Sequence, residues 1–504
     1  MGAEKEQGVI TNKRFSFVPR LNPFQWFLHL LPAIIFTAYV YTAQGPYQSA
    51  SCLAFNKNCK TFSPLHMEGL LDRPEYYQPA IDYYKHLLFT HEDLGGSLAV
   101  FVDGKPVIDI YAGSKDLEGT IPYANNTLQQ VYSSGKAVEG IIIARFVQKG
   151  LLDYNKKVGE YWPEFSQNGK QDVRLVDIMT HESGVMYLDG WDLGWHSLKD
   201  QESFSDRLAK QPHHFGGKIA RAYHAVSRGW YLNEIVRRVD PQGRTIGQIA
   251  REELMHDYKD VELHYSHFEK DTDWEERLSP MFDYPVLRIV GRLLIPRFIQ
   301  VNKWFGYPDS IPLHPLVWQL IQKWSLSSKA VTPKMAPFAP SFRTKEAHAT
   351  ESTSFSLKTN AHSLAKLMAM MANKGASLNP GQEPDLISSE IYSESTTFHS
   401  SLPCHITFET LPLSRGGWIK RKDFYGDGAL KGVEVQGWGG AGGSLTLWIE
   451  ELGIGFAYVT NAFGAAEAVL GDFRGKGILE RVVRARKQEL GLLPVDPVSQ
   501  KAHN

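Results

Sequence analysis

The chain is poor in cysteine and carries almost no net charge. Its 504 residues include three cysteines, and 54 Lys and Arg balance 55 Asp and Glu for a formal net charge of −1. Three cysteines cannot form a disulfide framework, and a neutral chain without a basic block is not expected to be a general nucleic-acid-binding protein. With 43% hydrophobic and 22% charged residues, the composition is that of a globular protein with one large domain or two ordinary ones.

Two widespread hydrolase motifs are also missing. The chain has no G-x-S-x-G turn and no H-E-x-x-H pair, which excludes the usual α/β-hydrolase elbow and the zincin metal site. Residues 437–442 read GWGGAG and match G-x-G-x-x-G, but the β-rich SLTLWI follows them where a dinucleotide site requires a helix. We therefore expect a glycine-rich strand edge there, with no metal and no cofactor.

The chain has one long apolar run, at residues 24–43. FQWFLHLLPAIIFTAYVYTA is interrupted only by a glutamine, a histidine and a proline, and about 20 apolar residues are needed to cross a bilayer. The run therefore predicts a transmembrane helix. Basic residues precede it and none follows before Lys57, so the positive-inside rule predicts a single-pass protein with a cytosolic tail at 1–23 and everything after residue 45 outside the cytosol or in a lumen.

A cleaved signal peptide is the alternative interpretation of this run. Ala43 would be the small residue at the cleavage site, but Tyr41 stands two places before it, where an A-x-A-like site requires another small residue. An uncleaved signal-anchor is therefore favoured. Glu6 occupies the position at which a myristoylation signal requires Ser or Thr, so no lipid anchor is expected.

Two further features fit exposure to a compartment outside the cytosol. Cys52 and Cys59 lie seven residues apart in a linker at 44–72 and could form a disulfide there, although free thiols are an equal alternative. Asn125 begins an N-N-T sequon, which is a glycosylation site only on that side of a membrane.

Hydrophobic patterns predict strands at both ends of the main domain and helices between them. Residues 97–113 alternate around Asp103-Gly104, the strongest short-range signal for a β-hairpin, and residues 444–461 form a second hairpin around Glu451-Leu452. Helical spacing predicts helices at 74–95, 133–149, 226–239, 358–373 and 472–490. This order predicts an α+β fold: one antiparallel sheet flanked by helices, with an all-helical insertion.

Residues 282–300 are apolar but contain Arg288, Arg292 and Arg297, so the segment is too charged to span a membrane. One interpretation is a lid, or an amphipathic helix that lies on a membrane. The other is an ordinary surface helix, which is the more common use of such a pattern.

Ser133 and Lys136 stand one helical turn apart in VYSSGKAVEG. A serine hydroxyl needs a nearby base, and lysine can be that base only when burial or cationic neighbours lower its pKa from about 10.4. An i to i+3 spacing brings the two Cβ atoms to about 5–6 Å on one helix face. If Ser133 opens the helix, its N–H group is also free to bind an oxyanion. One turn could therefore hold a nucleophile, its base and half of an oxyanion hole.

A second S-x-x-K pair, Ser363 and Lys366, shows how weak the spacing is by itself. This pair lies inside the helical pattern NAHSLAKLMAMMANKG, where the backbone amides are already hydrogen-bonded and none is free to stabilise an oxyanion. We interpret it as a coincidence.

Five longer stretches give the first pair its context. In chain order they are NTLQQVYSSGKAVEG, VRLVDIMTHESGV, YHAVSRGWYLNEIVRRV, KTNAHSLAKLMAMMANKG and GWGGAGGSLTLWIEELGIGFAYVTN. With these landmarks the chain resembles the serine β-lactamase-like superfamily, above all the class C β-lactamases, penicillin-binding proteins and related serine esterases. The likeness covers roughly four-fifths of the sequence. It implies a serine hydrolase domain at 73–492 with a helical subdomain inserted at about 155–400.

The resemblance implies a role for each matching residue. Ser133 would be the acylated nucleophile, Lys136 the proton acceptor and Tyr223 the phenol that relays protons to the leaving group and the hydrolytic water. The backbone amides of Ser133 and Ala441 would form the oxyanion hole, beside the third motif, Trp438, Gly439 and Gly440, on the substrate side. Acid–base work by Tyr223 would require a lowered pKa, which a charged Lys136 could provide.

The sequence departs from the β-lactamase pattern at two positions. Ala225 replaces the Asn of the Tyr-x-Asn motif, and Trp438 replaces the Lys or His that usually begins the third motif. The loss of that cation weakens the expectation of a substrate carboxylate. His224, next to Tyr223, could titrate near the site or lie on the surface, whereas His181 resembles a structural residue at a turn.

These observations favour a membrane-anchored serine hydrolase that cleaves an ester or amide of a fairly apolar acyl group through a Ser133 acyl-enzyme. A catalytically silent binding or self-assembling module is one alternative, motivated by Ala225 and Trp438. An acyltransferase is another, because the same acyl-enzyme serves both reactions. The expected partner is a small-molecule or peptide acyl substrate, together with the membrane; the sequence does not predict an oligomeric state.

Overall fold

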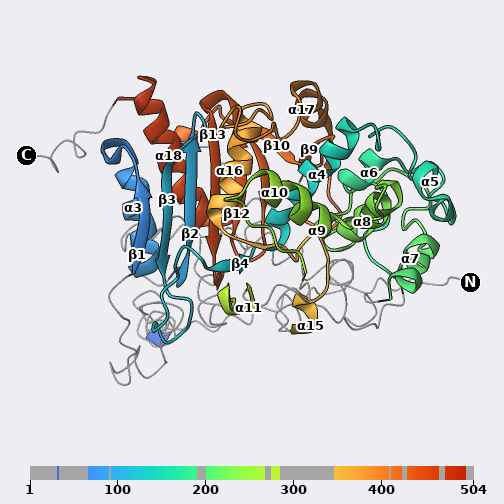
Figure 1. The fold of residues 1–504 in the computed structure, drawn as a ribbon, viewed down its shortest axis with the longest axis horizontal. Helices are drawn as coiled ribbons and strands as arrows, with labels where there is room; N and C mark the ends of the chain where they lie inside the picture. Colours follow the sequence, from blue (N-terminus) through green and yellow to red (C-terminus); the bar gives the residue numbers. More distant parts are fainter. Residues whose placement is uncertain are drawn as a thin grey trace, which may run out of the picture.

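The computed structural model describes residues 31–32, 66–89, 92–189, 200–266, 274–283, 345–407, 410–422, 428–464 and 471–494. Its centre is a nine-stranded sheet in the order β1-β3-β2-β13-β12-β11-β10-β9-β8, in which all neighbouring strands are antiparallel (Figure 1). The strands are β1 (Met67–Leu71), β2 (Gly95–Val102), β3 (Lys105–Gly113), β8 (Phe398–Pro403), β9 (Thr410–Ser414), β10 (Ile419–Lys422), β11 (Glu434–Gly439), β12 (Leu445–Ile449) and β13 (Ile454–Thr460). The predicted antiparallel sheet is confirmed.

Both predicted hairpins are present and together they join the two ends of the domain. β2 and β3 turn at Asp103 and Gly104, whose φ angles of 49° and 78° are those of a tight hairpin turn. β12 and β13 are joined by the 3₁₀ turn η7 (Glu450–Leu452). β13 then pairs with β2, with Tyr458 opposite Leu98. Segments far apart in the sequence therefore form the middle of one sheet.

Two smaller sheets lie beside the main one. β4 (Leu128–Gln130) pairs with β5 (Leu278–Ser279) and with β7 (Lys358–Thr359). β14 (Ala462–Phe463) pairs in parallel with β6 (Phe282–Asp283). The first of these sheets matters for function, because β4 leads directly into the Ser133 turn.

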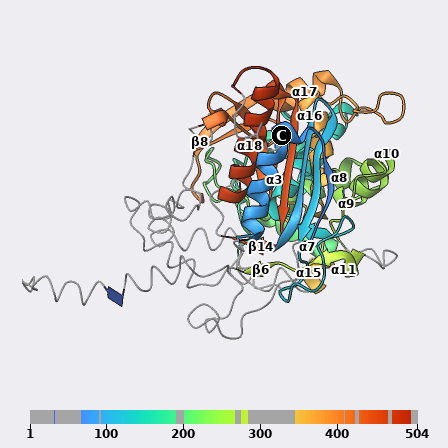
Figure 2. The same ribbon diagram turned by 90° about the vertical axis from the view of Figure 1, so that its left-hand side faces the viewer.

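Helices cover both faces of the main sheet. α3 (Pro74–Phe89) and α18 (Phe473–Glu489) lie side by side on one face (Figure 2). α16 (Ala361–Ala372) packs on β13, β12 and β2 from the other face. It approaches so closely that a Cβ atom on Gly455 would lie 2.3 Å from the backbone nitrogen of Ala369. Glycine at this position therefore sets the helix–sheet distance.

The first helix is shorter than predicted. The pattern at 74–95 predicted one helix to Gly95, whereas α3 ends at Phe89 and Gly95 already begins β2. The reason is tertiary. Asp93 is fully buried and accepts hydrogen bonds from the side chains of Thr460 and Tyr458 on β13, so this segment is bonded to the sheet and cannot continue the helix.

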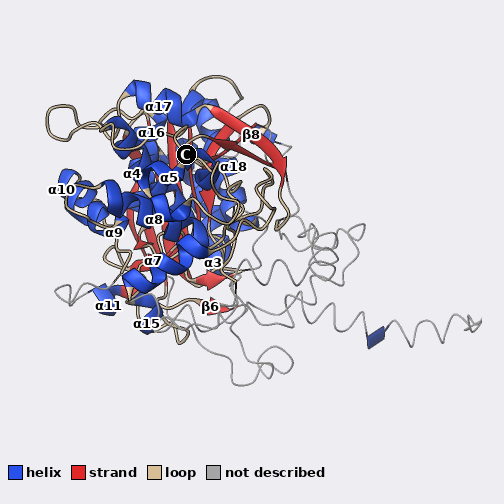
Figure 3. Ribbon diagram, turned by 90° about the vertical axis from the view of Figure 1, so that its right-hand side faces the viewer, coloured by secondary structure: helices blue, strands red, loops and turns tan. Residues whose placement is uncertain are grey.

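A lobe of short helices lies beside the sheet, at the right in Figure 1 and facing the viewer in Figure 3. Its helices and turns are η1 (Tyr132–Gly135), α4 (Lys136–Gln148), α5 (Val158–Tyr161), η2 (Pro163–Phe165), α6 (Leu175–Met179), α7 (Gln201–Lys210), α8 (Ser227–Val239), α9 (Ile246–Ile249), the π-helix η4 (Ala250–Leu254) and α10 (Met255–Asp257). The other short helices are α11 (Trp274–Arg277), α15 (Lys345–His348), α17 (Ser389–Thr396) and η6 (Gly428–Leu430), the last of which packs against α18. The helical insertion predicted at about 155–400 also contains α16, which the structure assigns to the sheet layer.

α4 is the buried centre of the molecule between lobe and sheet. Most of its residues are buried on every side, so it is hydrophobic all round, as expected of a core helix. Gly140 leaves room for Trp418 of the sheet edge, whose ring would lie 2.8 Å from a Cβ atom at that position. The Trp418 indole N–H also donates to the carbonyl of Ala137 over 3.1 Å.

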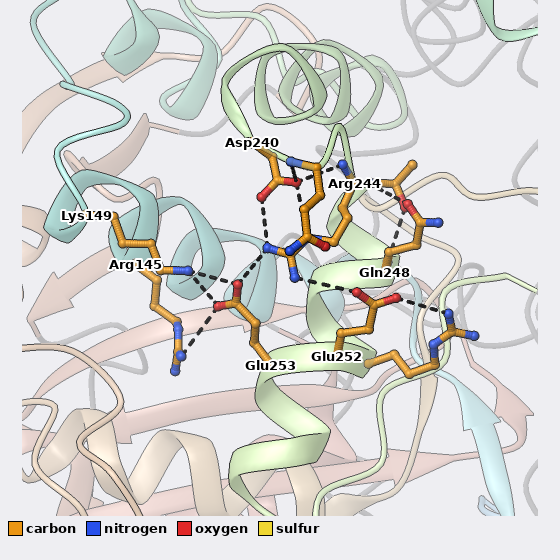
Figure 4. Close-up of polar contacts among 10 residues, drawn as sticks. Arg145, Lys149, Asp240, Arg244, Gln248, Glu252 and Glu253 are labelled. Atoms are coloured by element: carbon orange, nitrogen blue, oxygen red, sulfur yellow. Dashed lines mark hydrogen bonds and ion pairs between the residues drawn. The ribbon is translucent and has the colours of Figure 1, made fainter.

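The far end of α4 is held by a network of ion pairs (Figure 4). Glu253 accepts from Lys149 at 2.8 Å and from Arg244 at 2.9 Å, and lies 3.6 Å from Arg145. Arg244 is also paired with Asp240 at 2.8 Å. The network connects α4 with the segment that follows α8 and with the π-helix η4.

Several predictions fall outside the described residues. These are the membrane span at 24–43 apart from residues 31–32, both partners of the possible Cys52–Cys59 disulfide, and nearly all of the segment at 282–300. No helix within the described ranges is both long and apolar enough to cross a bilayer. Cys404, the third cysteine, is a buried free thiol.

Candidate active site

Ser133 lies in a strained turn between β4 and α4. Tyr132, the residue before it, has a φ of 47°, which is unusual for a bulky residue. The turn is held by the Val131 N–H, which donates to the Leu357 carbonyl at 3.0 Å, and by an edge-to-face contact of Tyr132 with Phe463. Such strain is often found at functional sites. Here the turn leaves Ser133 half-buried while its neighbour Ser134 is fully buried.

The structure brings the three predicted side chains together. The Lys136 Nζ atom lies 3.2 Å from the Ser133 Oγ atom, and the Tyr223 hydroxyl donates to that same Oγ at 2.8 Å. Lys136 is fully buried and Tyr223 is 8% exposed. Tyr223 comes from the segment before α8, 90 residues from the serine, so the cluster is a product of the tertiary fold.

Lys136 is fully buried, and backbone carbonyls accept hydrogen bonds from its amine. Its Nζ atom donates to the carbonyls of Ala225 at 2.8 Å and Ser354 at 2.9 Å. Burial is the largest effect on this amine and lowers its pKa well below the ordinary value; Glu139 opposes that shift and Arg228 adds to it. An unprotonated amine has two N–H bonds, which the two carbonyls accept. Its lone pair is then free to face Ser133.

Tyr223 sits between two other rings. It stacks on Trp438 with ring centroids 5.8 Å apart, and His181 contacts it edge-on at 4.9 Å. Burial raises the pKa of Tyr223 above its ordinary value, against weaker lowering by the Ser133 hydrogen bond and by Arg228. The expectation of a lowered pKa is therefore wrong for the free protein, because desolvation of the buried phenol outweighs the groups that lower its pKa.

Trp438 does not face the substrate side as predicted. Its side chain is fully buried, and its indole N–H donates to the carbonyl of Gly417 at 2.8 Å. The sequence placed it beside the substrate because the third motif begins there, but strand alternation turns this side chain into the core. In the structure Trp438 supports the Tyr223 ring.

The two histidines of the site are internal. The backbone N–H of His224 donates to the ring Nδ1 atom of His181 at 3.1 Å, and the ring Nε2 atom of His224 lies 2.9 Å from the Ser183 hydroxyl. Burial lowers the pKa of His224 to about 3 and that of His181 well below its ordinary value. Of the two interpretations of His224, neither a surface residue nor a titrating neighbour fits; both histidines are neutral structural groups.

The end of β11 lies against the Ser133 turn. A Cβ atom on Gly440 would lie 2.1 Å from the carbonyl oxygen of Val131, so only glycine permits this approach. The Gly440 N–H is used in a 2.8 Å bond to the Ser444 carbonyl. Within the described residues, no hydrogen bond uses the N–H of Ser133 or of the half-buried Ala441. These two groups are the predicted oxyanion donors, and that role stays a prediction.

Other predicted residues lie apart from this cluster. The Ser363 hydroxyl accepts the Glu262 N–H at 2.8 Å, and Lys366 pairs with Asp260 and Glu383, so the second S-x-x-K pair is used in other contacts. Asn125 is exposed; its glycosylation stays a prediction.

One group among the described residues has the composition of a metal site. Ligand atoms of Asp177, Glu182 and His399 lie within 4.8 Å of one another. Glu182 is already bonded to Arg221 and to the Ser400 hydroxyl. Protein partners therefore account for its charge, and nothing else in the site requires a metal.

Sequence reasoning missed a buried ion pair next to Lys136. Glu139 and Arg228 are both fully buried, and the Arg228 Nε atom lies 2.9 Å from Glu139 Oε2. A signal was present: Glu139 interrupts the apolar run that follows Lys136, and a carboxylate on a core helix requires a partner. The partner of Glu139 could not be identified from the sequence, because Arg228 belongs to another helix.

The family model named Beta-lactamase matches residues 81–477. The esterase/β-lactamase LipL of Mycobacterium tuberculosis is 36% identical over 209 residues, which are 41% of this chain and 44% of LipL. A β-lactamase of Yersinia enterocolitica is 28% identical over 219 residues, 44% of this chain and 47% of that protein. The chain thus matches slightly less than half the length of these curated relatives.

Solved structures show the same fold at low identity. A penicillin-binding protein homologue from Caulobacter crescentus aligns with a TM-score of 0.66 at 23% identity, covering 83% of this chain and 100% of its own. A family VIII carboxylesterase aligns with a TM-score of 0.66 at 21% identity, with the same coverage of 83% and 100%. The fold is the β-lactamase/transpeptidase-like α+β fold. Since the family model spans most of its length, the chain belongs to the β-lactamase family.

Proposed function

We propose that this protein is a serine hydrolase that cleaves an ester or amide through an acyl-enzyme on Ser133. The observation that carries the proposal is that the buried amine of Lys136 and the phenol of Tyr223 both lie within 3.2 Å of the Ser133 hydroxyl oxygen. The carboxylesterase and the esterase/β-lactamase among its relatives support this class of reaction.

Acylation would begin with transfer of the Ser133 hydroxyl proton to the unprotonated Lys136 amine. The Oγ atom attacks the substrate carbonyl carbon, and the resulting oxyanion is stabilised by the N–H groups of Ser133 and Ala441. Tyr223, which keeps its proton in the free protein, donates it to the leaving group and is reprotonated from Lys136. In deacylation, water attacks the acyl carbonyl while its proton passes through the Tyr223 hydroxyl to the Lys136 amine. Collapse of the tetrahedral intermediate returns that proton to the Ser133 Oγ atom and releases the acid.

The lining of the site favours an acyl group without a carboxylate. The cation of the usual third motif is missing, and Trp438 points into the core. A Cβ atom on Gly442, beside Ala441, would touch the side chains of Met281 and Phe463. Apolar side chains next to a proposed oxyanion donor suit an ester or amide of a fairly apolar acid.

Activity-based labelling tests this function. The full-length protein is treated with a fluorophosphonate probe and the modified residue is mapped. We expect a Ser133 adduct that disappears in Ser133→Ala, and turnover of short p-nitrophenyl esters that disappears with it. Labelling that persists in Ser133→Ala would refute the assigned nucleophile. The matched control is Ser134→Ala, since Ser134 is buried and lies 3.0 Å from the Ser444 hydroxyl.

Transfer of the acyl group to an alcohol or amine is the second candidate. Ser133 is half-buried, so any alcohol or amine that can enter the site could attack the acyl carbonyl of the acyl-enzyme in place of water and release Ser133. Adding alcohols or amines to the ester assay distinguishes the two reactions. A new ester or amide product formed in preference to the free acid would identify a transferase.

We also propose that the apolar run at 24–43 anchors the protein in a membrane with the hydrolase domain outside the cytosol. The exposed position of Asn125 is compatible with glycosylation on that side. We expect a glycosidase-sensitive mass shift in cells that Asn125→Gln removes. A fully cytosolic, protease-accessible hydrolase domain in intact membranes would contradict this topology.

A further inference from the structure

The mechanism above leaves one charged pair beside Lys136 without a role. Glu139 stands one helical turn after Lys136 on α4, and Arg228 stands near the start of α8, which follows the Tyr223 segment. Their charged atoms are 2.9 Å apart, and neither side chain is exposed. Glu139 is thus three residues from Lys136, and Arg228 is five residues from Tyr223.

Glu139 is connected to the amine of Lys136 through a short buried segment. The Thr353 hydroxyl donates to Glu139 Oε1 at 2.6 Å. The next residue, Ser354, supplies the carbonyl that accepts from Lys136, and its hydroxyl accepts the Gly229 N–H at 2.8 Å. A Cβ atom on Gly229 would lie 2.5 Å from the Ser354 nitrogen, so this glycine lets the segment close on α8.

Arg228 is a costly residue for the fold. One Nη atom donates to the Gly417 carbonyl at 3.2 Å, whereas Nε and the second Nη have no hydrogen bond with any described residue. The contact with Glu139 is close but lacks the alignment of a hydrogen bond. An apolar pair of the same volume would often stabilise a core better than such a pair. A buried, incompletely bonded guanidinium next to reactive groups indicates a role other than stability.

We propose that Glu139 and Arg228 are positioning residues for the reaction at Ser133. Glu139 anchors, through Thr353, the carbonyl that holds the amine of Lys136 in place. Arg228 places one fixed positive charge behind that amine. The inference rests on the proposed hydrolase function and adds to it the groups that decide whether the base is ready to accept a proton.

The charged groups around the Lys136 amine determine the direction in which each substitution should move its pKa. Lys136 is faced by Glu139 on its own helix, Arg228 on α8, Tyr223 before α8 and His181 after α6. Tyr223 and His181 are both held neutral, because burial raises the pKa of the first and lowers that of the second. Glu139 and Arg228 are thus the charged groups that act on the amine, and they act in opposite directions.

The test is the pH dependence of fluorophosphonate labelling and ester turnover in the full chain. Loss of positive charge in Arg228→Met should move the acidic limb of kcat/KM to higher pH by about one unit, so that the rate at a fixed pH on that limb falls by ~10-fold. Glu139→Gln keeps the hydrogen bond to Thr353 and should move the limb to lower pH. Arg228→Lys should restore the wild-type limb.

Two further variants separate charge from anchoring and from general damage. Thr353→Val removes the anchor without changing any charge, so kcat should fall by ~10-fold while the limb keeps its position. Arg145→Met removes an arginine from α4 nine residues, about 14 Å, beyond Lys136, and should change neither. If the single charge variants fold poorly, the double variant Glu139→Gln/Arg228→Met removes both charges at once and should have a limb close to that of the wild type.

The possible failures point to different conclusions. Wild-type protein that is not labelled at Ser133 would overturn the hydrolase function and this inference with it. Wild-type labelling at Ser133, with acidic limbs that stay in place or move in the same direction in Arg228→Met and Glu139→Gln, would overturn the inference alone. A double variant displaced as far as Arg228→Met would overturn it as well.

Discussion

The two ends of α4 hold charges in different ways. At its start, Glu139 and Arg228 form an ion pair in which neither side chain is exposed. At its far end, Arg145, Glu253 and Lys149 belong to an ion-pair network (Figure 4). The side chains of these three residues are 14%, 16% and 39% exposed. Partly hydrated pairs cost little to form and contribute little. A dry pair costs desolvation of both partners. The cost of the first pair is what motivates the positioning role proposed for it, whereas the second pair needs no role beyond joining neighbouring helices.

The largest expected difference between the two ends is in catalysis. Lys136→Met should lower kcat/KM for p-nitrophenyl esters by ~10³-fold, because a positioned general base contributes about that much. Lys149→Met, on the same helix but 39% exposed, should leave the rate within ~2-fold of wild type, because its partner Glu253 lies outside the site. Steady-state kinetics on both variants checks this. Equal losses would show that the comparison reflects the integrity of the helix and not the position of a base.

Stability should differ in the same direction. Glu139→Ala leaves Arg228 buried without a counter-ion, so we expect a loss of about 3–5 kcal/mol in the free energy of unfolding. Glu253→Ala leaves Arg145, Lys149 and Arg244 with access to water or to other carboxylates and should cost at most about 1 kcal/mol. Urea unfolding of the full chain measures both. A cost for Glu253→Ala as large as that for Glu139→Ala would contradict the distinction between dry and hydrated pairs.

Acid should destabilise the protein through the two buried histidines near the start of α4, His181 and His224. His181 and His224 are neutral in the fold, with the pKa of His224 lowered to about 3 by burial. Below pH ~6.5 the unfolded chain binds protons that the folded chain does not, so stability falls as the pH drops. For His224 the fall is about 1.4 kcal/mol per pH unit and continues to about pH 3. His224→Gln should reduce that slope. His256→Gln, whose side chain is 74% exposed, is the control and should leave it unchanged.

Salt should produce the smallest difference between the two ends of α4. Raising the ionic strength from about 0.1 to 1 M shortens the screening length from about 10 to 3 Å. The contribution of Arg145, measured as the unfolding free energy of wild type minus Arg145→Met, should shrink by a few tenths of a kcal/mol. The acidic limb of kcat/KM should stay in place, because the Glu139–Arg228 pair excludes solvent ions. A limb that moved with salt would show that this pair is hydrated.

Local patterns predicted much of this molecule correctly. The Asp103-Gly104 turn, the second hairpin before β13 and the core helix after Ser133 depend on neighbouring residues, and each appears as expected. Where tertiary contacts opposed the local pattern, the prediction failed. The helix expected to reach Gly95 ends at Phe89, because the chain that follows is bonded into the sheet.

The candidate site divides in the same way. Motif order predicted Ser133, Lys136 and Tyr223 as one cluster, and the structure brings them together. The burial of Trp438 was not predicted, and the pKa of Tyr223, which was expected to be lowered, is raised by burial. Both depend on which groups lie behind a side chain, and no spacing along one segment contains that information.

The sequence by itself determined the chemical groups of this protein, the strands and helices that carry them and the family to which it belongs, because these depend on residue type and short-range order. Tertiary structure alone decided which groups are dry and which charges face one another. A lysine becomes a base, and an Arg228–Glu139 pair becomes its neighbour, only when segments about 90 residues apart exclude water from the same small volume.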